Sequence, residues 1–197
     1  MAFDFSDSEK AKYISAKHAL GSIKGGMRVG LGTGSTASWF IVLLAELIRK
    51  DGLNILATST STQTRILAES LGIKVVSLKE INRIDLTVDG ADEFDGQLNL
   101  IKGGGGALLQ EKIVAAASSR MIVIADDTKR VNTLGKFPLP IEIVPFGVET
   151  IERNLSKLLT SFGYKKPKGI LRKKINEVFV TDEGLYILDY ELSRIDK

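Results

Sequence analysis

The segment DGADEFDGQLNLIKGGGGALLQEKI, residues 89–113, combines side chains and bare backbone in a way that could support chemistry. Four acidic residues come first, followed by one lysine, four consecutive glycines and a further glutamate. Acids repel each other and glycines weaken a fold. This composition therefore indicates either a costly loop or a site at which charge and exposed backbone are both needed.

The acidic half of this segment has two interpretations from its residues alone. An EF-hand calcium loop needs a bidentate acid at its twelfth position, and counting from Asp89 or Asp92 reaches Leu100 or Gly103 instead. That loop is excluded. A magnesium ion bound by an acidic pair stays open, and so does a polar turn in which aspartates cap backbone amides.

The glycine half could stabilise negative charge and move a proton. Gly103 to Gly106 lead into a predicted helix, so their amides form a cradle for an anion. Lys102, directly before them, could stabilise a developing oxyanion. Glu111 follows inside the helix and could act as a base, although beside Lys112 it also resembles an ordinary solvated helix face.

A second glycine-rich segment, VGLGTGSTASWF at residues 29–40, reads as a turn from a strand into a helix. Amides at a helix start favour an anion. Ser35 occupies the place of the third glycine of the dinucleotide fingerprint, and no lysine follows the last glycine as in a Walker loop. Hydroxyls among the amides suit a monoester phosphate, whereas a turn with Ser or Thr as helix N-cap is the alternative. Those hydroxyls belong to Thr33, Ser35 and Thr36.

The elements that must position these residues alternate between short apolar strands and helices from residue 7 to about residue 126. We expect strands at 27–32, 53–58, 73–78, 84–90 and 120–126. This alternation predicts an α/β fold with a Rossmann-like parallel sheet and helices on both faces. Ligands of such sheets gather at the carboxyl ends of the strands, where all three candidate segments begin.

The first helix has its own signals. Ser6, followed three residues later by Glu9, predicts a capping box, and Gly25-Gly26 are expected to end the helix. His18, the single histidine, falls on or near the apolar face and is expected to pack. A histidine-based triad is thereby excluded, so a carboxylate must carry any proton transfer.

The residue composition changes near residue 130: all four prolines lie from Pro138 onward. A strand, a helix at 148–163 and a hairpin at 176–192, with its turn at Asp182-Glu183-Gly184, are expected there. We predict two domains: an α/β catalytic domain at 1–129 and a small α+β, ferredoxin-like subdomain at 130–197 that is incomplete at its C-terminus.

Charge and composition limit the partners. The net charge is +3, but residues 165–174, KKPKGILRKK, hold six basic residues, and the rest of the chain is slightly acidic. We interpret this patch as a solvated loop leading into an edge strand, with a polyanion site as the alternative.

The chain has no cysteine, its first ten residues do not resemble a secretory signal, and its longest apolar run, 39–48, is too short to span a bilayer. We expect a cytoplasmic protein without nucleic-acid or membrane partners.

Four motifs together resemble one known family. GLGTGSTA, DGADE, KGGGGAL with EKI, and LGKFPLPIEIVP occur in the order and spacing of the A-type ribose-5-phosphate isomerases, over nearly the whole chain. The resemblance implies interconversion of ribose 5-phosphate and ribulose 5-phosphate through an enediolate. It also implies that no metal and no organic cofactor are needed, and that the protein is a homodimer or higher homo-oligomer.

The resemblance also implies roles for individual residues. Glu111 is the expected base, Lys102 with the amides of Gly103, Gly104 and Gly105 steadies the enediolate, and Asp89 and Asp92 hold sugar hydroxyls and assist ring opening. The other expected substrate-binding residues are Lys12, Thr33, Gly34, Ser35, Thr36, Gly90, Ala91 and Lys129.

Two observations qualify the resemblance. Family members continue beyond a segment like YILDYELSRIDK with a further helix and closing strands, whereas this chain ends at Lys197. A non-catalytic sugar-phosphate sensor of the same fold is the principal alternative function, but a sensor has no use for Glu111 and Lys102. A deaminase, a coenzyme A transferase or a dehydrogenase fits the motifs less well.

Overall fold

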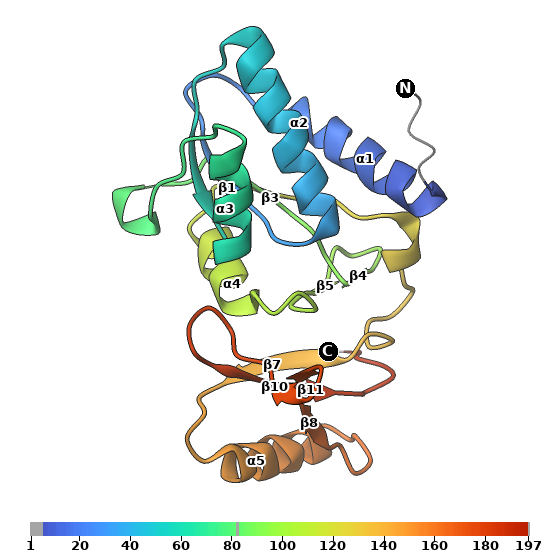
Figure 1. Ribbon diagram of the computed structural model, residues 1–197. Helices are drawn as coiled ribbons and strands as arrows, with labels where there is room; N and C mark the ends of the chain where they lie inside the picture. Colours follow the sequence, from blue (N-terminus) through green and yellow to red (C-terminus); the bar gives the residue numbers. More distant parts are fainter. Residues whose placement is uncertain (1–5, 82, 197) are drawn as a thin grey trace. The chain divides into compact units, whose positions relative to one another are not determined.

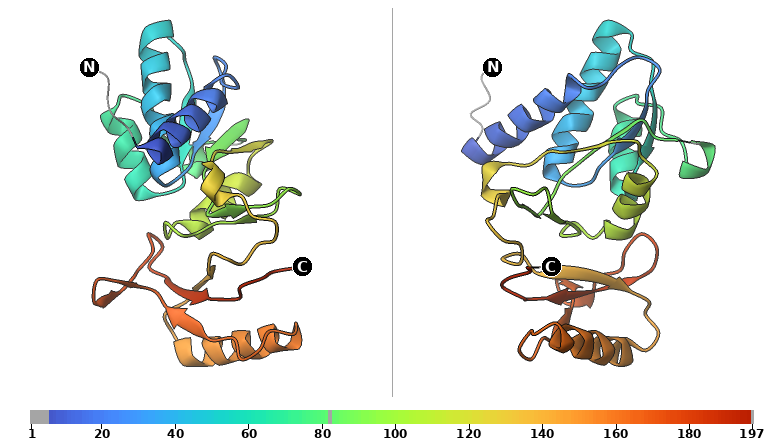
Figure 2. Two further views of the ribbon diagram at one scale, coloured as in Figure 1. Left: turned by 90° about the vertical axis from the view of Figure 1, so that its right-hand side faces the viewer. Right: turned by 180° about the vertical axis from the view of Figure 1, so that it is seen from behind.

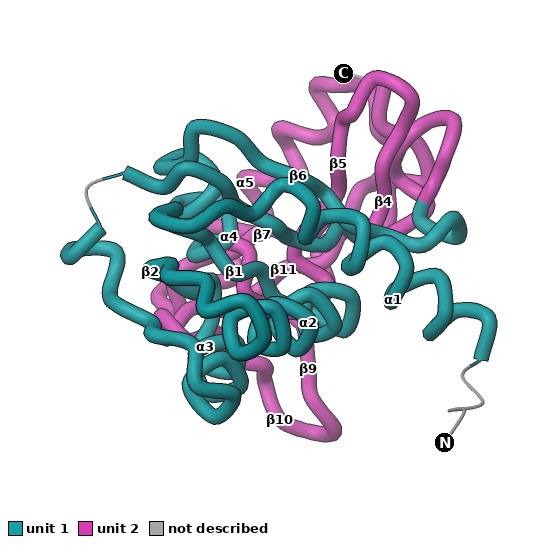
Figure 3. The backbone as a smooth tube through the Cα atoms, turned by 90° about the horizontal axis from the view of Figure 1, so that it is seen from above, with its two compact units in different colours: residues 1–91, 109–129 teal, residues 92–108, 130–197 magenta. Residues whose placement is uncertain are grey.

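The computed structural model describes residues 6–81 and 83–196, which form two compact units (Figure 3). The first unit comprises residues 1–91 and 109–129, and the second comprises 92–108 and 130–197. The sequence assigned 92–108 to the first domain. These residues instead belong to the second unit, where Glu93 accepts hydrogen bonds from the amides of Gly135 and Phe137 at 2.8 and 2.5 Å.

The first unit is built on a four-stranded parallel sheet with the order β2-β1-β3-β6. Figure 1 labels its two central strands, β1 and β3. Its strands are β1 (Arg28–Leu31), β2 (Leu56–Ser59), β3 (Leu86–Asp89) and β6 (Met121–Val123). The strand expected at 73–78 is reduced to one parallel bridge between Ala57 and Val75. With that bridge as a fifth position, the chain order across the sheet is that of the Rossmann fold, which confirms the predicted class.

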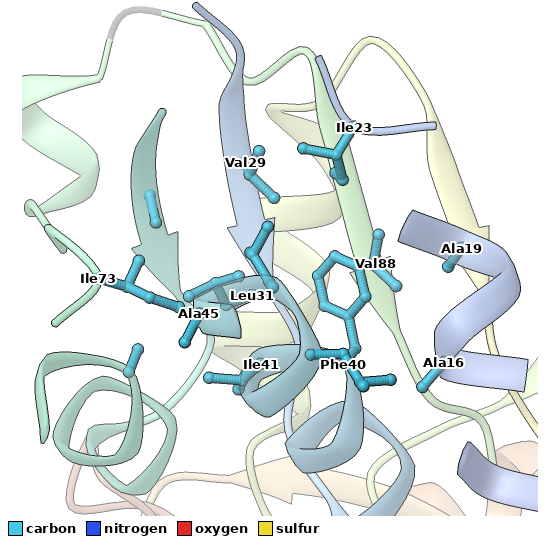
Figure 4. Packing of buried hydrophobic residues seen from close by; sticks show 14 of the residues in the cluster. Ala16, Ala19, Ile23, Val29, Leu31, Phe40, Ile41, Ala45, Ile73 and Val88 are labelled. Carbon is cyan, nitrogen blue, oxygen red and sulfur yellow. The ribbon is translucent and has the colours of Figure 1, made fainter. Parts of the chain in front are cut away.

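Helices cover both faces of this sheet. Successive side chains of a strand point to opposite faces, and the apolar side chains on each face are buried by helices. Val29 and Leu31 of β1, with Val88 of β3, point to the face that carries α1 (Asp7–Leu20), α2 (Ser35–Asp51) and α3 (Thr62–Ser70), where Phe40 of α2 fills the core (Figure 4). On the opposite face, Val114 of α4 (Leu108–Ala116) packs with Ile84 and Ile81.

The first helix starts where the sequence predicted and ends earlier. The Ser6 hydroxyl accepts a hydrogen bond from the amide of Glu9 at 3.3 Å, so the predicted N-cap is confirmed. The helix ends at Leu20 with Gly21 as its C-cap, ahead of Gly25-Gly26. His18 is exposed, so its expected packing role is wrong: the buried residues of this helix are the small Ala16 and Ala19.

The second unit contains a three-stranded antiparallel sheet in the order β7-β11-β8, formed by β7 (Leu139–Ile143), β11 (Tyr186–Tyr190) and β8 (Gly169–Leu171). Helix α5 (Val148–Ser161) lies along this sheet (Figure 2), and Leu159 packs with Ile143, Leu188 and Tyr190. Two short hairpins complete the unit: β4 (Glu93–Phe94) with β5 (Leu100–Ile101), and β9 (Lys173–Lys174) with β10 (Glu177–Val178).

The hairpin predicted at 176–192 is wrong in its pairing, although its turn exists. The amide of Gly184 donates to the carbonyl of Thr181 at 2.9 Å. However, β10 pairs with β9, whereas β11 pairs with β7 and β8. Strand β11 buries Ile187, Leu188 and Tyr190, and an apolar strand of this kind is stabilised at the centre of a sheet, with a partner on each side. No helix in the described residues is long and apolar enough to cross a membrane.

Candidate active site

The turn after β1 and the end of β3 meet at one point of the sheet edge. From β1 the chain first runs outward through β2, and it then returns to the other side of β1 to form β3 and β6. The β1–β3 boundary is therefore the switch point at which such folds bind ligands. Asp89, the last residue of β3, is fully buried. Its Oδ1 accepts hydrogen bonds from the amides of Thr33 at 3.0 Å and Gly90 at 2.7 Å. Two segments predicted to be functional are therefore brought together.

This close approach requires a glycine at position 32. A Cβ atom there would overlap both the carboxylate and the Cα of Asp89. Two residues later, Gly34 has a φ of 107° and is the N-cap of α2, which begins at Ser35. Since the cap has no side chain, the alternative in which a Ser or Thr hydroxyl caps this helix does not apply. Gly34 and Ser35 are exposed and Thr36 is half-buried, so the first amides of α2 are open to an anion.

A cluster of hydroxyls holds this turn from the neighbouring strand, and the sequence analysis did not identify it. The Thr33 hydroxyl lies 2.7 Å from that of Thr60, 2.9 Å from that of Ser61 and 3.2 Å from that of Thr64. The Thr64 hydroxyl also donates to the carbonyl of Gly32 at 2.9 Å. The run TSTQT directly after β2, residues 60–64, was the available signal, because the ends of adjacent parallel strands lie at the same edge.

Glu111 lies in the first turn of α4 and is only 4% exposed, whereas the adjacent Lys112 is exposed. The alternative of a solvated helix face is therefore wrong for this residue. Val114, three residues later on the same face, is buried in the core beneath the sheet. Because α4 leads the chain back to the start of β6, its first turn is at the carboxyl edge of the sheet, as is Asp89.

Two lysines of the first unit are held by nearby acids or turns. Lys12 of α1 donates to Oε1 of Glu9 at 2.7 Å, and the indole of Trp39, in α2, donates to Oε2 of the same carboxylate at 2.8 Å. These two bonds, chiefly the one from Lys12, lower the pKa of Glu9. Lys129 ends a short 3₁₀ turn, η2 (Asp127–Lys129), which Asp126 stabilises by accepting from the Thr128 amide at 3.0 Å.

The second unit brings Asp92 and the glycine segment together. The amide of Asp92 donates to the carbonyl of Ile101 at 2.8 Å, which closes the base of the β4–β5 hairpin next to Lys102. Oδ2 of Asp92 accepts the amide of Gly104 at 2.7 Å. Gly105 is exposed and Lys102 is half-buried. The amide of Gly104 is thus engaged by Asp92, whereas Gly105 is accessible.

The other acids of the opening motif stabilise backbone. Glu93 is buried against two amides of the second unit, as described above, and Oδ1 of Asp95 accepts the amides of Gln97 and Asn99 at 2.8 and 2.9 Å. The polar-turn interpretation is therefore right for these two residues. Within residues 6–81 and 83–196, no group of three or more His, Cys, Asp or Glu side chains could hold a metal ion.

The sheet order, the glycine turn at its switch point and the buried aspartate beside it define the first unit as an α/β ligand-binding fold of the Rossmann-like class. Comparison with known proteins specifies the family. Residues 56–197 match the family model described as ribose 5-phosphate isomerase A (phosphoriboisomerase A). Ribose-5-phosphate isomerase A of Ruegeria sp. (strain TM1040) is 53% identical over 195 residues, which cover 99% of this chain and 74% of the relative.

Solved structures agree with this assignment. A D-ribose-5-phosphate isomerase in complex with phospho-erythronic acid superposes with a TM-score of 0.90 at 40% identity, covering 98% of this chain and 82% of the other. Ribose 5-phosphate isomerase A of Methanocaldococcus jannaschii gives 0.89 at 37% identity, with 97% and 83% covered. The chain belongs to the ribose 5-phosphate isomerase A family. It is an aldose-ketose isomerase that interconverts ribose 5-phosphate and ribulose 5-phosphate.

Proposed function

We propose that isomerisation proceeds through an enediolate, with Glu111 as the base that carries the proton. The observation that supports this role most directly is the burial of Glu111 in the first turn of α4. Its position at the carboxyl edge of the sheet is where ligands of this fold class bind.

In the open-chain aldose, the base removes the proton from C2, and the electron pair forms the C1–C2 double bond. The C1 carbonyl oxygen then receives the negative charge. Return of the proton to C1, with transfer of the O2 proton to O1, yields the ketose, and no atom is gained or lost. Donors directed at the charged oxygen lower this barrier most. We assign that function to Lys102 and the amides of the glycine segment.

The phosphate group is assigned to the N-terminus of α2. Gly34, Ser35 and Thr36 offer amides and hydroxyls there, and Thr33 stabilises the turn that leads to them. Lys12 is tied through Glu9 to Trp39 of the same helix, which supports its role as a cation near that end. The structural relative in complex with phospho-erythronic acid, a phosphorylated acid, makes this compound a suitable probe of the site.

The remaining assignments concern the sugar. Asp89 and Asp92 would hold hydroxyls and assist ring opening, with Gly90 and Ala91 between them, and Lys129 would bind substrate from the turn after β6. An oligomeric form and a cytoplasmic location stay predictions from the sequence.

The decisive experiment is Glu111→Gln, which keeps the shape of the side chain and removes the base. We expect kcat to fall by about 10²- to 10⁴-fold, with binding of phospho-erythronic acid largely retained. Glu46→Gln, on an exposed site of α2, is the matched control and is expected to behave as the unmodified protein. Full turnover by Glu111→Gln would refute the base assignment, and binding without turnover in the unmodified protein would favour the sensor alternative.

A further inference from the structure

Arg172, in the basic segment of the second unit, is not a solvated residue. Its side chain is 15% exposed, whereas the following Lys173 and Lys174 are exposed. Arg172 directly follows the edge strand β8, and its guanidinium forms a two-point pair with Asp189 of the central strand β11. In that pair Nε lies 2.8 Å from Oδ2 and Nη2 lies 2.5 Å from Oδ1.

The third nitrogen of this guanidinium reaches the glycine segment. Nη1 donates to the carbonyl of Gly103 at 2.8 Å and to the carbonyl of Gly104 at 3.1 Å. Both carbonyls belong to the same compact unit as Arg172. One arginine side chain, held in a fixed plane by Asp189, therefore orients two successive carbonyls of a segment that has no side chains of its own.

The peptide between Gly103 and Gly104 is held on both sides. Its carbonyl accepts from Arg172, and its amide, on the opposite side of the trans peptide, donates to Asp92 at 2.7 Å. The next peptide has its carbonyl on Arg172 as well, so the amide of Gly105 points away from the guanidinium. Gly105 is exposed, so a ligand can approach this residue.

A glycine segment needs such an external constraint. Glycine has the largest conformational freedom of any residue, and donors stabilise a developing charge only when they are oriented before the reaction. Position 104 cannot gain a side chain to limit this freedom, because a Cβ there would overlap Asp92 and approach Phe137. The orientation must come from hydrogen bonds to the backbone: Asp92 holds the amide of Gly104, and Arg172 holds the carbonyls of Gly103 and Gly104.

We propose that Arg172 is a positioning residue for the isomerase reaction: its contacts with Gly103 and Gly104 orient the amide of Gly105 toward the enediolate oxygen. This inference rests on the proposed role of the glycine segment. Lysine cannot replace arginine here, because an ammonium is a single point charge, whereas the planar fork reaches Asp189 and the two carbonyls at once.

The test is Arg172→Lys in the full chain, which keeps the positive charge. We expect kcat for ribose 5-phosphate to fall by about 10- to 100-fold, as for misplaced catalytic groups, with KM and the melting temperature little changed. Lys173→Ala, which removes a charge from the adjacent exposed side chain, is the control and is expected to leave kcat unchanged. An unchanged kcat in Arg172→Lys would overturn the inference, as would a loss explained entirely by unfolded protein.

A second variant separates orientation from folding. In Arg172→Ala, added guanidinium ions should restore part of kcat without a matching rise in melting temperature, and they should not accelerate the unmodified protein. If rescue follows recovered stability alone, Arg172 has only a structural role. Glu111→Gln in the same assay separates the two proposals. If Glu111→Gln is inactive and Arg172→Lys is fully active, only the positioning role of Arg172 is refuted. If Glu111→Gln is fully active, the base assignment is refuted.

Discussion

The amide of Thr33 donates to Oδ1 of Asp89 at 3.0 Å, across the boundary between β1 and β3. Fifty-six residues separate these two along the chain. The bond ties the turn that precedes α2 to a buried carboxylate at the end of the adjacent strand. Phosphate binding and sugar binding, as proposed for these segments, would therefore depend on a shared contact.

Gly32→Ala is expected to disturb this contact. The added methyl group would overlap Asp89, so the turn must move away from the strand. We expect a loss of about 1–3 kcal/mol of stability, typical of overpacking, together with a raised KM for ribose 5-phosphate. Gly25→Ala is the control, because its Cβ would meet Leu53 at an ordinary 3.7 Å. Equal melting temperatures and KM values for the two variants would contradict this account.

Thr64→Val tests the hydroxyl cluster. Valine matches threonine in shape but lacks the hydroxyl that donates to the carbonyl of Gly32. A buried acceptor that loses its donor costs about 1–3 kcal/mol, and the turn before α2 becomes less rigid. We expect weaker binding of phospho-erythronic acid, measured by calorimetry, beside unchanged binding in Ser70→Ala at the exposed end of α3. Unaltered affinity in Thr64→Val would show that the cluster does not support the phosphate site.

Chelation tests the prediction that the reaction needs no metal. The proposed carrier of the proton is the carboxylate of Glu111, and the proposed donors to the charged oxygen are Lys102 and backbone amides. We expect the rate of ketose formation to be the same before and after dialysis against EDTA. Lost activity that returns on addition of magnesium would show that the acidic segment binds a cation after all.

The burial of Tyr190 predicts that the second unit loses stability at alkaline pH. Its side chain is fully buried, its hydroxyl donates to the carbonyl of Glu152 at 3.2 Å, and burial raises the pKa of the phenol above 10.0. The protonated form is thus favoured in the folded state. This stabilising contribution is complete below about pH 10, the pKa in the unfolded chain, and is lost as the pH rises through the folded-state pKa.

Tyr190→Phe isolates this effect from the titration of other groups. We expect the unmodified protein to be more stable than Tyr190→Phe near neutral pH, by about 1 kcal/mol for the lost hydrogen bond. Urea unfolding followed by circular dichroism should show this difference shrinking above about pH 10. A difference that is constant with pH would mean that ionisation of Tyr190 is not coupled to folding.

Features that depend on local sequence were predictable. The N-cap Ser6, the strands that became β1 and β3 and the glycine turn before α2 all follow from residues within a few positions of each other. The strand expected at 73–78 was overestimated. Its apolar residues are typical of a strand, but the structure has one parallel bridge there, between Val75 and Ala57. Apolar pattern alone does not determine how many bridges form.

Features that depend on distant partners were not predictable in the same way. The burial of Glu111 was not visible beside the charged Lys112. The pairing of β11 with β7 and β8 instead of β10 depends on competition among strands, which a turn signal does not resolve. Arg172 looked like one cation among six, and only the carbonyls of Gly103 and Gly104, some 69 residues away, distinguish it.

The contacts of Arg172 determine when, during synthesis and folding, the glycine segment can become oriented. A chain emerging from the ribosome exposes Gly103 and Gly104 long before it exposes Arg172 and Asp189, and such sequence-distant contacts form late because loop closure is costly. Until β11 has joined its sheet, Asp189 is not in place to hold Arg172, and the glycine segment lacks the two carbonyl contacts that Arg172 supplies. The formation of β11 would thus decide when the proposed catalytic segment becomes oriented, so shortened chains that end before Asp189 should accumulate as inactive proteins even where the first unit has already folded.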